Sequence, residues 1–473
     1  MDEIVETKPA RPSRYGLTRW VVGRELAVEL SETTKLALPM VLTQVGQIAM
    51  ITTDLAFIGR IGTEALAAAA LAGRVYLVCV TFGFGVLAAI APVAAQAFAA
   101  DNLAVLRRSL RMGLCAALLL SLPMMAFAFH GEHILLALGQ GPDVSRLAQQ
   151  YLRGLAWGVA PALCFQAIRN FMAAVNRPEP VFWIMLTATP MNGLLVYVLI
   201  YGKLGLPRLD LFGAALATTL VNCGTFSAGL WVATMRRPFR DYHVLVDLWR
   251  FDWPLMRQLI VIGAPISVAS LIGYGFFTAA ALLAGLISPS ALAAHQIAFQ
   301  VAAILFMLSF GISMAAAVRV GHAVGRNDGP GVKRAGLAAS LLGIVITAIL
   351  TLTVIAARFE IAVLFLDQSA DDADATIGLA AKLLLVGASF FISDSVANIT
   401  AGSLRGLKDT RVLFVFAGIA YWLIGFSLSY ALSLKMGLGA IGIWIGLSIG
   451  TTVYAGLLVL RFLLLANRFT LQR

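Results

Sequence analysis

The sequence predicts an all-α polytopic membrane protein with twelve transmembrane helices, arranged as two homologous six-helix lobes. Three observations lead to this prediction. The 473-residue chain is 60% hydrophobic and only 12% charged, with a mean hydropathy of +0.88, whereas soluble domains carry about 25% charged residues. Apolar segments of about 20 residues, the length that spans a bilayer, recur along the whole chain. The second half of the chain also repeats motifs of the first half.

Twelve segments have the length and apolar character of membrane-spanning helices. Gly and Pro are frequent inside them, as membrane helices tolerate. The first six are expected at about 34–58, 64–92, 107–129, 147–175, 180–201 and 212–235. The second six are expected at about 257–284, 291–317, 334–357, 377–403, 410–432 and 439–465.

An internal repeat divides these helices into two sets of six. KLALPMVL aligns with VIGAPISV, which places Pro39 over Pro265. The same offset places EALAA over SALAA, and it continues through a long stretch of both halves without a break. Such self-similarity indicates two homologous halves. Because six is an even number, both halves begin on the same side of the membrane. Transporters with a parallel repeat usually bind their substrate between the halves.

Basic residues predict the orientation. Most of the 35 Lys and Arg residues fall in the two terminal segments and in the loops on one side, which the positive-inside rule places in the cytoplasm. The loop between the ninth and tenth helices holds four acids, as suits an outer loop: Asp367, Asp371, Asp372 and Asp374. The predicted organisation is a cytoplasmic N-terminal tail (1–32), an N-terminal lobe (33–235), a cytoplasmic linker (236–256), a C-terminal lobe (257–465) and a cytoplasmic C-terminal tail (466–473).

Composition and motifs argue against several other classes. A net charge of +11 would suggest nucleic-acid binding in a soluble chain, but here the cytoplasmic loops account for it. Glycine-rich runs such as GFGVLAA lack the Lys-Ser/Thr ending of a phosphate loop. The loops contain no Ser-His-Asp or zinc-ligand spacing. We therefore expect neither an enzyme nor an ATP-driven pump, and no cofactor.

The motifs resemble those of the multidrug and toxic compound extrusion (MATE) family, and within it the bacterial NorM-like branch. The resemblance covers about residues 32–465 and is found in KLALPMVLTQVGQ, FGFGVLAAIAPVAAQAFAA, FQAIRNFMAAVNRPEP, AAHQIAF, RVGHAVG and AGSLRGLKDT. It implies a multi-pass protein of the bacterial inner membrane, in contact with membrane lipid. Its expected activity is secondary antiport, which exports amphipathic, often cationic, small-molecule drugs in exchange for H⁺ or Na⁺. A monomer is the simplest expectation, because one chain contains both lobes.

Two acids within predicted helices match positions that the family links to cation coupling. On insertion scales, a charged side chain at the centre of a membrane helix costs roughly 2.5–3.5 kcal/mol. Asp394 lies just before AGSLRG and is the first candidate for proton coupling, or for holding Na⁺ if sodium is the coupling ion. Asp54, fifteen residues after Pro39, is the second. The alternative interpretations are a structural ion pair for Asp394 and an acid near the membrane surface for Asp54.

Four further residues are candidates for substrate binding. Arg74 is an intramembrane cation at a depth similar to that of Asp54, so we hypothesise that the two pair, in which case Asp54 would stay ionised. The resemblance implies that Gln296 in AAHQIAF faces the central cavity, with simple helix packing as its alternative. The other two are Asn192, and Asn398 one helical turn after Asp394.

The chain departs from the family pattern at two places. NorM-like members commonly carry a Glu eight residues after the Pro of the seventh helix, where this chain has Gly273. The archaeal-type pattern places an acid four residues after Asn192, where this chain has Val196. Na⁺ needs several hard oxygen ligands, so the loss of a carboxylate favours proton coupling.

Two alternative functions remain open from the sequence. One is a lipid-linked oligosaccharide flippase of the same superfamily, which predicts a basic cavity; Arg74, Arg169 and Lys382 support it. The other is a non-transporting membrane receptor with the same fold, which would have no reason to retain a buried acid at Asp394.

Overall fold

Twelve long helical segments form the protein, as the sequence predicts. The computed structural model describes the chain except for residues 1–13, 204, 206, 244–249, 366–372 and 472–473. The first half contains α1 Arg14–Gly59, α2 Thr63–Leu87, α3 Ile90–Ala99, α4 Leu103–Phe129, α5 Gly131–Ala137, α6 Pro142–Ala174, α7 Glu179–Tyr201, α8 Asp210–Met235 and η1 Phe239–Tyr242. The second half contains α9 Trp253–Ile287, α10 Pro289–Gly325, α11 Gly329–Ala356, α12 Arg358–Phe365, α13 Ala373–Gly406, α14 Arg411–Ala417, η2 Gly418–Phe426, α15 Ser427–Tyr430, η3 Ala431–Lys435 and α16 Gly439–Leu471.

The predicted helices differ from the observed ones in a few places. The span expected at 64–92 is two helices, because Pro92 cannot donate a backbone hydrogen bond and the chain turns at residues 88–89 before α3 begins. Residues 14–32 of the expected N-terminal tail are helical and continue into the first membrane helix. Of the four acids expected in an outer loop, only Asp374 lies among the described residues, in the first turn of α13.

Eleven of the helices in the described ranges are long and apolar enough to cross a membrane. The twelfth long helix, α6, contains Arg146, Arg153 and Arg169 and is not among these eleven. It is packed among α2, α4 and α8, so its polar residues have protein rather than lipid around much of the helix. Charged residues in membrane helices usually face such protein interiors.

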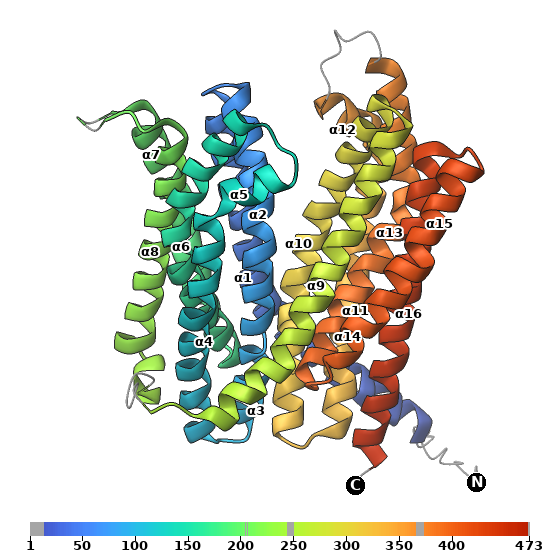
Figure 1. The fold of residues 1–473 in the computed structure, drawn as a ribbon. Helices are drawn as coiled ribbons and strands as arrows, with labels where there is room; N and C mark the ends of the chain where they lie inside the picture. The colour runs from blue at the N-terminus through green and yellow to red at the C-terminus, as the bar shows by residue number, and fades with distance from the viewer. Residues whose placement is uncertain (1–13, 204, 206, 244–249, 366–372, 472–473) are drawn as a thin grey trace, which may run out of the picture.

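The two halves of the chain form two separate bundles (Figure 1). Helices α1–α8 form one lobe and α9–α16 the other, and the start of α1 and the end of α16 lie at the same end of the molecule, called here the terminal end. The bundles meet at this terminal end and diverge toward the opposite end. The hydrogen bonds found between the lobes in the described ranges run from the terminal end to about the middle of α10, where Gln44 contacts Met307. The structure is therefore closed at the terminal end.

Residues that the predicted repeat aligns make equivalent contacts between the lobes. Gly85 packs on Ser267. The residues that the repeat aligns with these two, Gly311 and Val41, pack on each other in the same way. Gly321 packs on Ala95, with which the repeat also aligns it, so this pair meets across the pseudo-two-fold axis. The lobes are thus related by a parallel two-fold repeat.

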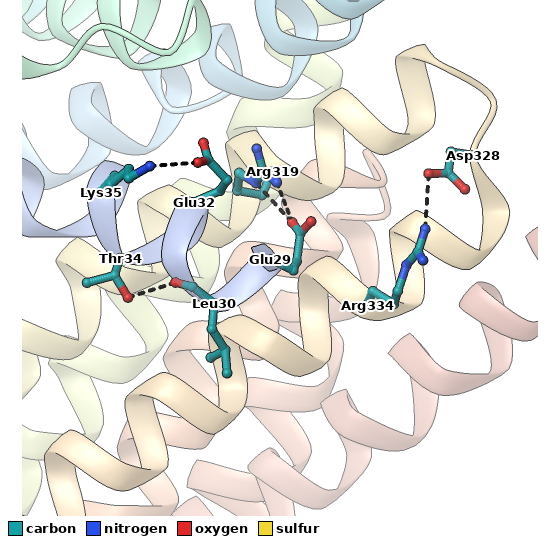
Figure 2. Close-up of polar contacts among 8 residues, drawn as sticks. All are labelled: Glu29, Leu30, Glu32, Thr34, Lys35, Arg319, Asp328 and Arg334. Carbon is teal, nitrogen blue, oxygen red and sulfur yellow. Dashed lines mark hydrogen bonds and ion pairs between the residues drawn. The ribbon is translucent and has the colours of Figure 1, made fainter. Parts of the chain in front are cut away.

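Ion pairs reinforce the terminal end. The start of α1 crosses beneath the second lobe, where Arg319 Nε and Nη2 donate to Glu29 Oε1 at 2.9 and 2.7 Å (Figure 2). Arg334 pairs with Glu25 and with Asp328. Because charge-assisted hydrogen bonds are stronger than neutral ones, these pairs stabilise the conformation in which this end is closed.

A methyl group at Gly311 is expected to open the terminal end. An added Cβ would lie 2.8 Å from Val41 Cα, and overpacking of this kind costs about 1–3 kcal/mol. We expect Gly311→Ala to populate a second conformation with a shorter distance between spin labels at Leu138 and Leu364, which are exposed at the opposite end of the two lobes. Pulsed electron paramagnetic resonance on a cysteine-free background measures this distance. Gly73→Ala is the matched control, since its Cβ would meet nothing within 4 Å.

Candidate functional site

The acid of the first lobe is held by two donors from neighbouring helices. Asp54 of α1 is only 9% exposed. Asn192 Nδ2, from α7, donates to Asp54 Oδ1, and Thr218 Oγ1, from α8, lies 3.2 Å from Asp54 Oδ2. Three helices therefore converge on one buried carboxyl group.

Thr218 allows this site to hold the carboxyl group in either protonation state. Its Oγ1 lies 3.2 Å from Asp54 Oδ2 and also 3.2 Å from the carbonyl oxygen of Ala214. A hydroxyl has one hydrogen. It donates to Asp54 when the carboxylate is ionised, and it donates to Ala214 and accepts from Asp54 when the acid is protonated. The arrangement can therefore gain and lose a proton with little movement of heavy atoms.

Asn192 adds an unused acceptor beside the acid. The residue is fully buried, and its Oδ1 has no hydrogen-bond partner within the part of the chain that the structure describes. Together with Asp54 and Thr218, it provides oxygen atoms of the kind that hard cations prefer. Asn192, predicted as a substrate-binding residue, is thus found in contact with the coupling candidate of its lobe.

The hypothesis that Arg74 pairs with Asp54 is wrong for this conformation. Arg74 is exposed, and none of the ion pairs among the described residues joins it to Asp54. Two residues at a similar predicted depth in the membrane can still lie on helix faces that do not meet. Lys382 is also exposed, whereas Arg169 is buried. The three cations therefore do not share one buried site in the described structure.

The acid of the second lobe lies beside an aromatic cluster. Asp394 of α13 is 6% exposed, and Asn398 Nδ2 donates to its backbone carbonyl oxygen at 2.9 Å. Tyr421 and Tyr454, whose ring centroids lie 4.8 Å apart, belong to this cluster, which reaches α13 through Phe277 and Phe390. Tyr421 belongs to the π-helix η2, an irregularity that often marks functional sites.

Position 273 faces the same cluster. A Cβ on Gly273 would lie 3.6 Å from Tyr421 Cε2, which is ordinary van der Waals contact. A Glu side chain at position 273, which the resemblance leads us to expect, would therefore extend toward the aromatic cluster near Asp394. Because position 273 on α9 is Gly, the acid beside this cluster comes from α13 and is Asp394.

The last predicted candidate, Gln296, and two buried histidines lie apart from the acids. Gln296 on α10 is exposed, so it is available to a ligand but is not part of either acid site. His295 Nδ1 accepts a hydrogen bond from Trp444 Nε1 at 3.2 Å. His322 Nε2 donates to the carbonyl oxygen of Ala174 at 2.7 Å, across the closed end. Both histidines thus make packing contacts.

Sequence reasoning missed Thr218 and Tyr421. Thr218 lies in ATTLVN, one of many hydroxyl residues in apolar helices, and no motif distinguishes it. Tyr421 lies in a continuous apolar helix, and the π-helical turn that places it near Asp394 leaves no mark in the composition. Both are identified only by packing between helices.

The sequence matches a known protein family and named bacterial proteins. A model of the MatE family matches residues 39–198 and 265–431. The chain is 60% identical over 448 residues to "Probable multidrug resistance protein NorM" of Bradyrhizobium diazoefficiens, with 95% of this chain and 96% of that protein covered. It is 54% identical over 434 residues to a protein of the same name from Rhodopseudomonas palustris, with 92% and 91% covered.

A solved structure has the same fold. "Outward-facing conformation of a multidrug resistance MATE family transporter of the MOP superfamily" matches with a TM-score of 0.86, covering 93% of this chain and 97% of that chain at 17% sequence identity. The two-lobe arrangement described above is therefore shared with a solved transporter.

Proposed function

Because this chain belongs to the MatE family of transporters, we propose that it is a secondary antiporter of the bacterial inner membrane that exports amphipathic, often cationic, compounds in exchange for protons. The observation that carries the proposal is the pair of buried carboxyl groups, Asp54 and Asp394, one in each lobe. Ionisable groups within membrane helices commonly mark ion and proton pathways. Such groups must differ in proton affinity between two conformations to couple an ion to a substrate.

Each acid has a separate role in the proposed cycle. Asp394 is the main coupling residue: its carboxyl group binds a proton from outside, and this proton is released inside as the lobes rearrange. Asp54 undergoes a second proton exchange, for which Thr218 provides a partner in both protonation states. Export follows if the substrate and the proton favour opposite conformations.

The closed end of the molecule is assigned to the cytoplasmic side. The excess of Lys and Arg near both termini supports this orientation. The conformation described here is then closed to the cytoplasm, and its lobes separate toward the outside. In this state a substrate is released outward and a proton can enter.

The proton is proposed over Na⁺ because of the surroundings of Asp394. Among the described residues, the side chain that hydrogen-bonds Asp394 is the amide of Asn398, and Gly273 supplies no second carboxylate. A hard cation would need more oxygen ligands than this. A proton needs one carboxyl group.

Gly273→Glu is expected to create a sodium response. The added carboxylate would project toward Tyr421, where its Cβ fits without a clash, and would complete a two-carboxylate site with Asp394. We expect Na⁺-driven export to rise several-fold over that of the wild type. Dye export from proteoliposomes under an imposed Na⁺ gradient measures it, and Gly273→Gln is the isosteric control without charge. Equal Na⁺ responses of the Glu and Gln variants would show that position 273 does not contribute to ion choice.

The proposed function is tested by reconstitution. Purified protein in liposomes is given a fluorescent cationic dye and, separately, a proton gradient or a Na⁺ gradient. We expect the proton gradient to drive dye transport and the Na⁺ gradient to leave it at the background rate. Transport driven by neither gradient would refute antiport as the activity.

A further inference from the structure

Arg169 is a buried cation without an acidic partner. Its side chain, on α6, is 7% exposed. Among the described residues its hydrogen bonds are made by Nη2 alone, to Gln44 Oε1 and, at 3.5 Å, to Met314 Sδ. Neither acceptor is charged, and Arg169 takes part in none of the ion pairs among the described residues. Burying a charge is costly unless an opposite charge or several hydrogen bonds compensate it.

Two other partly buried arginines have an acidic partner. Arg319 pairs with Glu29 at 2.7 Å, and Arg461 pairs with Asp409, also at 2.7 Å. Asp54 is not available to Arg169 in the same way. Gln44, which contacts Arg169, precedes Asp54 on α1 by ten residues, which is about 15 Å along a helix.

Arg405 shows what a purely packed arginine looks like in this fold. It is 8% exposed and also lacks a carboxylate partner among the described residues. However, it donates to Ala401 O and Ser313 Oγ and lies 5.9 Å from the centroid of the Phe310 ring. It lines neither of the two cavities described next. Packing therefore explains Arg405 but does not explain Arg169.

Arg169 borders two cavities and, among the described residues, is the only charged one that lines either of them. The larger cavity, of about 50 Å³, lies inside the first lobe among α1, α2, α6, α7 and α8. Its polar lining besides Arg169 consists of uncharged amides and a hydroxyl: Gln47, Gln166, Asn222 and Thr225. Phe84 and Phe165 are among its apolar lining residues.

The chemistry of this lining selects for an anionic group. A guanidinium has five N–H donors in a planar fork that matches a carboxylate, and the amides around it add further donors. An isolated buried cation repels a cationic group, so the charge of a conventional cationic substrate finds no partner here. The aromatic residues provide contact for the apolar body of a ligand, and the cavity has room for more than one water molecule.

We propose that Arg169 is a specificity-determining residue that binds a carboxylate group of the exported compound. The inference rests on the proposed function. In the conformation described here, the Gln44 amide oxygen occupies the place of the carboxylate. The bound group would displace it and pair with the guanidinium bidentately.

The test uses a fluorescent aromatic amphipath that carries a carboxylate, and its methyl ester, which has the same body without the negative charge. Equilibrium binding of both to the purified protein is measured alongside proton-driven export from liposomes. The variants are Arg169→Gln and Arg169→Lys. Arg153→Gln is the matched control, because Arg153 is an exposed arginine on the same helix. The liposomes are made with and without phosphatidylglycerol, to separate a soluble carboxylate from an anionic lipid headgroup as the ligand.

We expect the wild type and Arg153→Gln to prefer the carboxylate, and Arg169→Gln to lose roughly tenfold in affinity for the carboxylate while it binds the ester unchanged. Arg169→Lys should retain part of the preference. Equal losses for acid and ester in Arg169→Gln would indicate a structural role and overturn the proposal. A preference in the wild type that phosphatidylglycerol abolishes would assign the site to lipid and also overturn it. A preference in binding without proton-driven export would refute the proposed function and leave the carboxylate site standing.

Discussion

Replacing Asp394 with Asn is expected to reduce proton-driven export to the rate of protein-free liposomes. The amide has nearly the shape of the acid, so the packing around it is retained, but it cannot bind and release a proton. Coupling free energies between two ligands typically correspond to factors of roughly 5–150, and the whole factor is lost when the coupling group no longer titrates. Initial rates of dye export under an imposed pH gradient measure the effect.

The control for this variant is Asp374→Asn, the same substitution at an exposed acid in the first turn of the same helix. It should transport at the wild-type rate. Thermal unfolding in detergent should give the same midpoint for both variants. If Asp394→Asn exports dye at the wild-type rate, Asp394 is not the coupling residue.

Asp54→Asn is expected to have the second largest effect, a loss of roughly tenfold or more in proton-driven export. Asn192 donates to one carboxyl oxygen and Thr218 lies beside the other, so the new amide oxygen can accept from Asn192 while its NH₂ group donates to Thr218, which then donates to Ala214. Among the described residues, the unpaired Oδ1 of Asn192 is a further acceptor. The fold should therefore survive, while proton exchange at this acid stops. Dye export and thermal unfolding are measured together.

The double variant Asp54→Asn/Asp394→Asn distinguishes a shared cycle from two independent ones. Groups that act as a unit show strongly non-additive losses. The double variant should therefore be no worse than the poorer single variant. Asp143→Asn, at an exposed acid in the first turn of α6, is the control for the first lobe. Losses that multiply in the double variant would contradict a single coupled cycle.

Much of the fold could be predicted because the bilayer and the repeat constrain it strongly. Apolar segments must be helical to satisfy their backbone in lipid. Positions aligned by the offset that places Pro39 over Pro265 have the same local structure, even in turns. Asp101 and Asn327, which the same offset aligns, both have positive φ, and the residues that follow them cap α4 and α11 in the same way. The break before α3 and the helical start of α1 escaped prediction, because they depend on one proline and on packing against the second lobe.

The site was predicted only in part. Asp54, Asn192 and Asp394 were identified, because polar residues within membrane helices are conspicuous in the sequence. The contact between Asp54 and Asn192 could not be derived, and the expected partner Arg74 was wrong, because the rotation of each helix about its axis is determined by packing. The partners Thr218 and Tyr421 belong to helices other than those of the acids they approach, and no local pattern connects such residues.

The central claim is that substrate moving out is exchanged for protons moving in, and substrate-driven proton flux tests it most directly. Proteoliposomes that contain a pH-sensitive dye are prepared at equal pH on both sides, and an outward or inward gradient of the exported compound is imposed. The account predicts a pH change inside the liposomes in the direction opposite to substrate movement, absent in Asp394→Asn. Substrate movement through the wild-type protein with no change in internal pH would contradict it.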